Sequence, residues 1–180
     1  MAKKYKKTAR LAGVAVGVLA MVAFAPPLAA QPAVLGDSQA ACAPGAAGTA
    51  VLATVHGFKD RKGRLRLQNY RGTAGEYLET GKFLHREEVP VTAAGEMTLC
   101  LPLPGPGRYV LVALHDRDIN GKLSPFSDGI GFTKDPKLGL SKPPADKTVM
   151  DFGPGLNRVR IALNYLRGFS VRPLPADQVK

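Results

Sequence analysis

Beyond residue 48, apolar and polar residues alternate in short segments, and clusters of glycine and proline separate one segment from the next. Alternation places every second side chain on the same face of a β-strand, whereas an amphipathic helix repeats its apolar residues every three to four positions. No stretch beyond residue 31 combines that helical period with capping residues. The chain is therefore predicted to fold as an all-β protein.

Seven segments carry the strand pattern: 49–58, 64–70, 83–91, 97–103, 108–115, 148–152 and 158–165. The segment 108–115 is apolar on both faces, which is typical of a central strand that is covered on both sides. The charged cluster 59–63 predicts a hairpin between the first two strands. Together these segments predict an antiparallel β-sandwich of about seven strands over residues 49–165. The Ala-, Pro- and Gly-rich residues 31–48 are interpreted as a flexible leader, and residues 166–180 as a C-terminal tail with a possible edge strand at 169–171.

Residues 1–30 have the organisation of a secretory signal peptide. Five basic residues and no acid precede an uncharged apolar run over residues 11–25. That run is about 15 residues long, shorter than the roughly 20 that a membrane span needs. Small residues follow up to Ala30, so we expect cleavage after Ala30, with Ala40 as the second choice. An uncleaved membrane anchor and lipidation at Cys42 are the alternatives.

The net charge of +11 suggests a polyanionic partner, but much of it belongs to the predicted signal peptide. Removal of residues 1–30 takes away five basic residues and no acid, which leaves +6. Nucleic acid is not an expected partner, because export separates the chain from it and aromatic residues do not interleave the basic ones. An anionic envelope surface or an envelope protein is the candidate partner, and solvated surface charge is the alternative. The basic residues considered are Arg61, Lys62, Arg64, Arg66, Arg158 and Arg160.

Cys42 and Cys100 are the only two cysteines. An exported chain meets an oxidising compartment, so we predict that they form a disulfide. It would close a loop of about 58 residues and stabilise the fold by about 4 kcal/mol in the chain-entropy account. Two free thiols are the alternative, and no CxxC or HxxxH spacing supplies zinc ligands.

A pattern like the first half of a calcium-binding loop follows the segment 108–115. Oxygen-bearing side chains at alternate positions converge on one point, and a glycine then permits a sharp turn. The predicted site consists of Asp116, Asp118, Asn120, Lys122 through its backbone carbonyl, and Asp128, with Gly121 at the turn. Ser127 stands where a bidentate Glu is expected, so the pattern predicts weak Ca²⁺ binding at most. The alternative is an Asx-rich turn in which the same side chains accept backbone N–H groups.

The motifs around this loop resemble the DUF2141 family of exported bacterial proteins. They are Gly107-Arg108-Tyr109, His115-Asp116, Asn120-Gly121-Lys122-Leu123, Asp128-Gly129-Ile130-Gly131-Phe132, Lys142-Pro143-Pro144 and the closing segment 161–165. The resemblance covers residues 49–165 and implies an exported sandwich of transthyretin-like or immunoglobulin-like type, with no established activity. Asp118, Ser124 and Asp128 depart from the family's Asn, Asp and Glu, and the change at Ser124 removes a possible metal ligand.

Two functional hypotheses follow. The first is a non-enzymatic binding or structural module of the cell envelope, periplasmic or secreted, with no cofactor other than Ca²⁺ and membrane contact only through the signal peptide. The second is a hydrolase-like enzyme on a transthyretin-type scaffold that uses His115, Asp116 and Asp128. Adjacent residues of a strand point to opposite faces, and no GxSxG motif is present, so the first hypothesis is preferred. Convergence of His115 with two carboxylates in a pocket would favour the enzyme.

Overall fold

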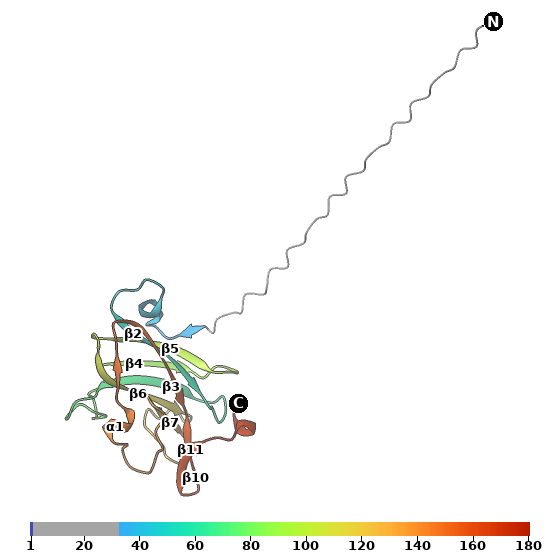
Figure 1. The fold of residues 1–180 in the computed structure, drawn as a ribbon. Helices are drawn as coiled ribbons and strands as arrows, with labels where there is room; N and C mark the ends of the chain where they lie inside the picture. Colours follow the sequence, from blue (N-terminus) through green and yellow to red (C-terminus); the bar gives the residue numbers. More distant parts are fainter. Residues whose placement is uncertain (2–32) are drawn as a thin grey trace. The chain divides into compact units, whose positions relative to one another are not determined.

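A computed structural model of the chain describes Met1 and residues 33–180 (Figure 1). The predicted signal peptide lies outside the described residues. Within the described residues, no helix is long and apolar enough to cross a membrane.

Two β-sheets make up the described part of the chain. The smaller sheet has the order β1-β5-β2-β9, with β1 at Val34–Leu35, β5 at Met97–Leu103, β2 at Thr49–His56 and β9 at Gly155–Ala162. The larger sheet has the order β11-β10-β7-β6-β3-β4, with β11 at Ser170–Pro173, β10 at Asn164–Arg167, β7 at Gly129–Phe132, β6 at Gly107–Asp116, β3 at Arg64–Arg71 and β4 at His85–Pro90. β8, at Met150–Phe152, also pairs with β6. The short helical turns are η1 at Gln39–Cys42, α1 at Ala145–Thr148 and η2 at Ala176–Gln178.

The predicted all-β sandwich is confirmed. Most neighbouring strands are antiparallel, but β1 pairs with β5 and β2 pairs with β9 in parallel. Inward side chains of both sheets form one buried cluster, which includes Val51, Leu67, Leu99, Leu111 and Ile161. The alternation in the sequence therefore marks the faces that the two sheets turn toward each other.

β6 is the central strand of the larger sheet, as its continuous apolar run predicts. It pairs along one edge with β3, and along the other with β8 and then β7. Leu111 and Ala113 face the cluster between the sheets. Val110 and Val112 face a second buried cluster on the outer side, which Phe132 and Val149 complete. Because both faces of β6 are covered, its sequence is a continuous apolar run without polar alternation.

The predicted hairpin of residues 49–58 and 64–70 is wrong. β2 pairs with β5 and β9 in the smaller sheet, whereas β3 pairs with β4 and β6 in the larger one. The connection between β2 and β3 therefore crosses from one sheet to the other, with Phe58 buried on the way. Gly63 lies at φ 76°, and a Cβ there would overlap the carbonyl oxygen of Asp116. The cluster 59–63 is thus a sheet-to-sheet crossing, which has the same turn residues as a hairpin.

The predicted single strand at 158–165 is in fact two strands in different sheets. β9 ends at Ala162 beside β2, and β10 begins at Asn164 beside β7 and β11. Ile161, Leu163 and Tyr165 are nevertheless all buried. Because both sheets face the same core, a chain that changes sheets keeps its inward side chains inward, and the alternation continues without interruption. The edge strand considered at 169–171 is present as β11, in a hairpin with β10.

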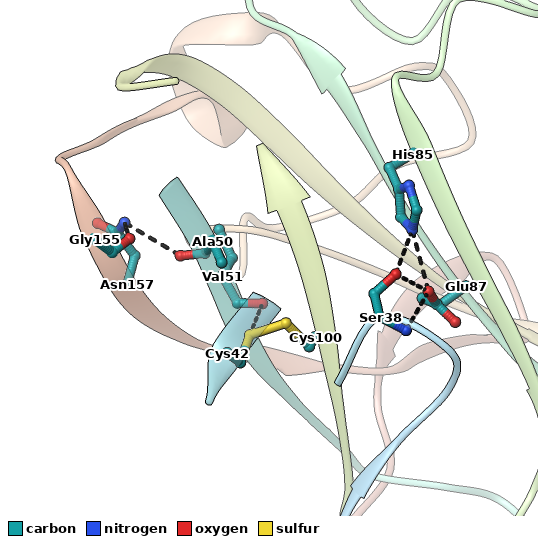
Figure 2. Close-up of a disulfide and its surroundings, with 9 residues drawn as sticks. All are labelled: Ser38, Cys42, Ala50, Val51, His85, Glu87, Cys100, Gly155 and Asn157. Atoms are coloured by element: carbon teal, nitrogen blue, oxygen red, sulfur yellow. Dashed lines mark hydrogen bonds and ion pairs between the residues drawn. A yellow bond between two sulfur atoms is a disulfide. The ribbon is translucent and has the colours of Figure 1, made fainter. Parts of the chain in front are cut away.

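Residues 34–42, which composition placed in a flexible leader, are attached to the sandwich at three points. β1 pairs with the edge of β5, and a disulfide joins Cys42 to Cys100 (Figure 2). The third point is Glu87 of β4, which accepts hydrogen bonds from the backbone N–H groups of Asp37 (2.9 Å) and Ser38 (3.1 Å). The predicted disulfide is therefore present, and it fixes the leader on the outer face of the smaller sheet.

We expect the Cys42→Ala/Cys100→Ala double variant to lose about 2–4 kcal/mol of unfolding free energy. The disulfide closes a loop of 58 residues, so its loss restores conformational freedom to the unfolded chain. Urea denaturation of both proteins measures the difference. Reductant should lower the stability of the wild-type chain to that of the double variant and leave the variant unchanged. Equal stabilities of the oxidised wild-type chain and the variant would contradict this role.

Candidate functional site

The candidate site is the loop 117–128, which joins β6 to β7. Antiparallel pairing of these strands brings Asp116 and Asp128 to the two sides of the loop's neck, where both are buried. Ile119 and Gly121 both have positive φ, at 57° and 75°. Glycine adopts this conformation freely, but a β-branched residue such as Ile119 does so only when surrounding contacts hold it there. The loop therefore has a defined conformation that its own contacts must stabilise.

The two buried carboxylates hold the loop through backbone N–H groups. Asp116 accepts from the N–H of Asn120 (3.2 Å) and of Gly121 (2.9 Å). Asp128 accepts from the N–H of Arg117 (3.0 Å) and of Ser124 (2.8 Å). These four bonds supply partners for amides that no strand ladder reaches.

The exposed side of the loop has a second hydrogen-bonded cluster. Asp118 accepts from the side-chain amide of Asn120 (2.9 Å) and from the hydroxyl of Ser124 (3.1 Å). Asn120 Oδ1 accepts from the N–H of Lys122 (2.7 Å). The Asx-turn interpretation of Asp116, Asp118 and Asn120 thus describes the observed contacts, with Lys122 taking part through its N–H.

The same arrangement brings three carboxylates together. One oxygen each of Asp116, Asp118 and Asp128 lies within 4.8 Å of the others. Asn120 and Lys122, the other predicted ligands, belong to the same loop but not to this carboxylate group. A carboxylate has about four lone-pair positions, so its hydrogen bonds leave some of them free for a cation. The geometry is compatible with one oxygen-ligated cation at this point.

Two arginines attach the loop to β3 and to the β2–β3 crossing. Arg66 of β3 donates to the carbonyl of Gly121 (2.9 Å) and pairs with Glu88 (2.8 Å). Arg117 donates to the carbonyl of Ser127 (2.8 Å) and forms an ion pair with Asp60 in the β2–β3 crossing. The hydrogen bond from Arg117 lowers the pKa of Asp60 below its ordinary value. Arg66, considered from the sequence as surface charge, is therefore a buried contact of the loop.

His115 lies on the opposite side of β6 from Asp116 and is completely buried. Its Nε2 is 2.8 Å from the carbonyl of Lys62, which can only accept, so Nε2 carries the proton. Its Nδ1 is 2.7 Å from the hydroxyl of Tyr165, which accepts from the N–H of Lys59 (3.0 Å) and donates to the ring. Burial lowers the pKa of His115 and raises the pKa of Tyr165, so both side chains are neutral.

This arrangement leaves His115 with no free nitrogen for acid–base catalysis. The ring packs edge-on against Phe58 in the core, with centroids 5.2 Å apart, and not in a pocket with Asp116 and Asp128. A general base must reach the proton that it removes from a substrate, and His115 has no access to one. The geometry required by the hydrolase hypothesis is therefore not found.

The fold also assembles a polar cluster that sequence reasoning missed. Ser38 Oγ lies 2.9 Å from His85 Nε2 and donates to Glu87, whose own distance to the same Nε2 is 3.1 Å (Figure 2). In a catalytic triad the acid holds the opposite ring nitrogen, whereas here both partners meet one nitrogen. Burial acts to raise the pKa of Glu87, but the hydrogen bonds from Ser38 and Asp37 outweigh it, and the pKa is lowered.

The cluster therefore anchors the leader rather than forming a nucleophile site. Gly36 has φ 91°, and a Cβ there would overlap the carboxylate of Glu87. One feature of the sequence could have indicated this cluster. Glu87 is an acid on the same face of β4 as the partly buried Val89.

A family model described as an uncharacterized protein conserved in bacteria, DUF2141, matches residues 53–160, which is more than half of the chain. The chain belongs to the DUF2141 family. No curated protein and no solved structure matches it. The DUF2141 match contains the whole loop 117–128, together with His115 and both neck carboxylates. It does not reach Tyr165, β1 or Cys42, so this chain's partner for His115 and its disulfide-linked leader lie outside the matched region.

We expect the unfolding free energy to fall as the pH drops below about 6.5, the ordinary pKa of histidine. The unfolded chain binds a proton at His115 that the folded chain resists, so stability is complete above that pH and is lost toward the lowered pKa. Urea denaturation between pH 7.5 and 5 measures this slope. His115→Gln, which retains a donor for Lys62 and an acceptor for Tyr165, should flatten it.

The matched control is His56→Gln, because His56 is only partly buried at the end of β2. This variant should keep the wild-type slope. An unchanged slope in His115→Gln would show that another group is responsible for the pH dependence.

Proposed function

We propose that this protein is an exported, non-enzymatic binding or structural module of the cell envelope, and that the loop 117–128 is its organised functional surface. The observation that carries the proposal concerns the three side chains that an enzyme would need as its acid and base groups. His115, Asp116 and Asp128 are buried and hydrogen-bonded to the chain itself. His115 joins parts of the core, and the two carboxylates hold the loop in a fixed conformation. Rigid scaffolds commonly present binding loops in this way.

Export is supported by the disulfide, since such bonds persist in oxidising compartments and are rare in the cytosol. The attachment of residues 34–42 to the sandwich supports cleavage after Ala30. Cleavage after Ala40 would remove β1 and Ser38, and with them two of the three anchors of the leader.

We also propose that the loop binds Ca²⁺ weakly. The support is the convergence of Asp116, Asp118 and Asp128 on one point. The affinity is expected to be low because the same oxygens already accept hydrogen bonds, and because Ser127 replaces the bidentate acid of a strong site. Extracellular calcium modules have dissociation constants of about 10⁻⁴–10⁻³ M.

Expression of the complete sequence in an exporting bacterium should yield a chain in the periplasm or medium that begins at Gln31. Cell fractionation, N-terminal sequencing and thiol alkylation measure the location, the cleavage site and the oxidation of Cys42 and Cys100. A control that lacks residues 2–30 should stay in the cytoplasm with both thiols reduced. An unprocessed cytoplasmic chain from the complete sequence would contradict the proposed function.

In the calcium experiment, 10 mM Ca²⁺ should raise the Tm of the wild-type chain by about 3–5 °C. This corresponds to about 1.4 kcal/mol for a dissociation constant of about 1 mM. Asp118→Ala should abolish the shift, whereas Asp151→Ala, which removes an exposed acid on β8, should keep it. The Tm shift is measured with and without Ca²⁺ for each variant, so an effect of the substitution on the Tm without Ca²⁺ does not affect the comparison. A wild-type Tm that Ca²⁺ leaves unmoved would exclude the metal site.

A further inference from the structure

Three segments that are distant in the sequence border one apolar hollow beside the loop 117–128. A cavity of about 200 Å³ lies between this loop, the segment 133–144 and the β10–β11 hairpin. Its apolar lining includes Leu123, Pro125, Leu138, Leu140, Leu166 and Val171. The three segments are therefore neighbours in space, although up to about 50 positions separate them in the chain.

Large apolar side chains project from these same segments into solvent. Phe126 is 86% exposed, Leu140 is 76% exposed and Phe169, at the turn between β10 and β11, is 100% exposed. Ile119 and Leu123 of the loop are also exposed, so the three segments hold five of the seven exposed large apolar side chains described in residues 33–180. Single exposed apolar residues are common on protein surfaces, but such a cluster indicates an interaction site.

These three segments also carry basic residues, four of which have side chains that bond to no other residue the structure describes. They are Lys122, Lys137, Arg167 and Arg172, and none of them forms an ion pair with a residue that the structure describes. Across the segments 117–128, 133–144 and 164–173, seven Lys and Arg residues stand against three acids, Asp118, Asp128 and Asp135. The three segments thus combine exposed apolar side chains with a net positive charge. We call this surface the docking end, defined by Phe126, Leu140, Phe169 and these four basic residues.

We propose that the docking end binds a bilayer surface that contains anionic lipids. The proposal rests on the proposed export, which places the chain beside a membrane. Apolar tips surrounded by Lys and Arg fit the boundary between acyl chains and anionic headgroups, where the tips are buried and the cations stay at headgroup level. The central part of a protein–protein interface is instead depleted of charge, and of Lys in particular. The charge pattern therefore favours a lipid surface over a partner protein.

The test is co-sedimentation of the exported, processed chain with vesicles. One set is pure phosphatidylcholine, and the other contains 30% phosphatidylglycerol. We expect binding to the anionic vesicles at 0.1 M salt, weaker binding at 0.5 M salt, and little binding to the neutral vesicles, because salt screens the electrostatic part of the attraction.

Two pairs of variants separate the apolar and the basic contributions. Phe126→Ser/Phe169→Ser should weaken binding at least tenfold, and its control is Leu156→Ser, which replaces an exposed apolar residue on β9 of the other sheet. Arg167→Gln/Arg172→Gln should weaken binding by about fivefold for each charge removed. Its control, Arg158→Gln/Lys82→Gln, removes the same charge elsewhere and should have a smaller effect. Thermal melting confirms that each variant is folded.

Three outcomes would overturn the proposal. They are no binding to anionic vesicles, binding that the docking-end variants and their controls reduce equally, and a photocrosslinker at position 126 that captures a protein or a second copy of this chain in the envelope instead of lipid. Failure of the proposed function is distinct from all three, because it appears in the fractionation experiment as a chain that is not exported. An exported chain that does not bind anionic vesicles would disprove only the proposed role of the docking end.

Discussion

Hydrogen bonds at the end of β6 connect the parts of this protein. His115 points into the core and joins the β2–β3 crossing, through Lys62, to β10, through Tyr165. Asp116, the next residue, points the other way and holds the amides of Asn120 and Gly121. Two neighbouring side chains thus fix the packing of the sheets on one side and the loop on the other. Both side chains are buried, so removal of His115 or Asp116 would leave buried polar groups without a hydrogen-bond partner.

The crossing between sheets explains why this junction is needed. Neither β2–β3 nor β9–β10 is a hairpin, and each pair is divided between the two sheets. A crossing has no continuous strand ladder, so its backbone groups must find other partners. Lys59 donates to Tyr165, Lys62 accepts from His115, and Asp60 binds Arg117, so side chains of β6, β10 and the loop stabilise this connection.

The carboxylates of Asp116 and Asp128 and the side chains of Arg66 and Arg117 hold the loop 117–128 in place. A loop that is already ordered can present side chains at fixed positions and lose little entropy when it binds. It carries the exposed Phe126, and its Leu123 and Pro125 line a hollow together with Leu140 and Val171 of the neighbouring segments. The same hydrogen bonds that occupy the neck carboxylates hold the loop as a rigid surface for contact.

The sequence by itself determined the secondary structure type, the inward face of most strands, the central place of β6 and the pairing of the only two cysteines. It also marked Asp118, Asn120 and Asp128 as members of one loop, with Asp116 directly before it. Only the tertiary structure decided which strands are neighbours, because alternation records the buried face of a strand and not its hydrogen-bonding partner. The contact between His115 and Tyr165, the cluster of Ser38 with Glu87, and the hollow lined by Leu123, Leu140 and Val171 likewise join residues about 17 to 50 positions apart. Such contacts depend on the path of the chain between the sheets, which local patterns do not encode.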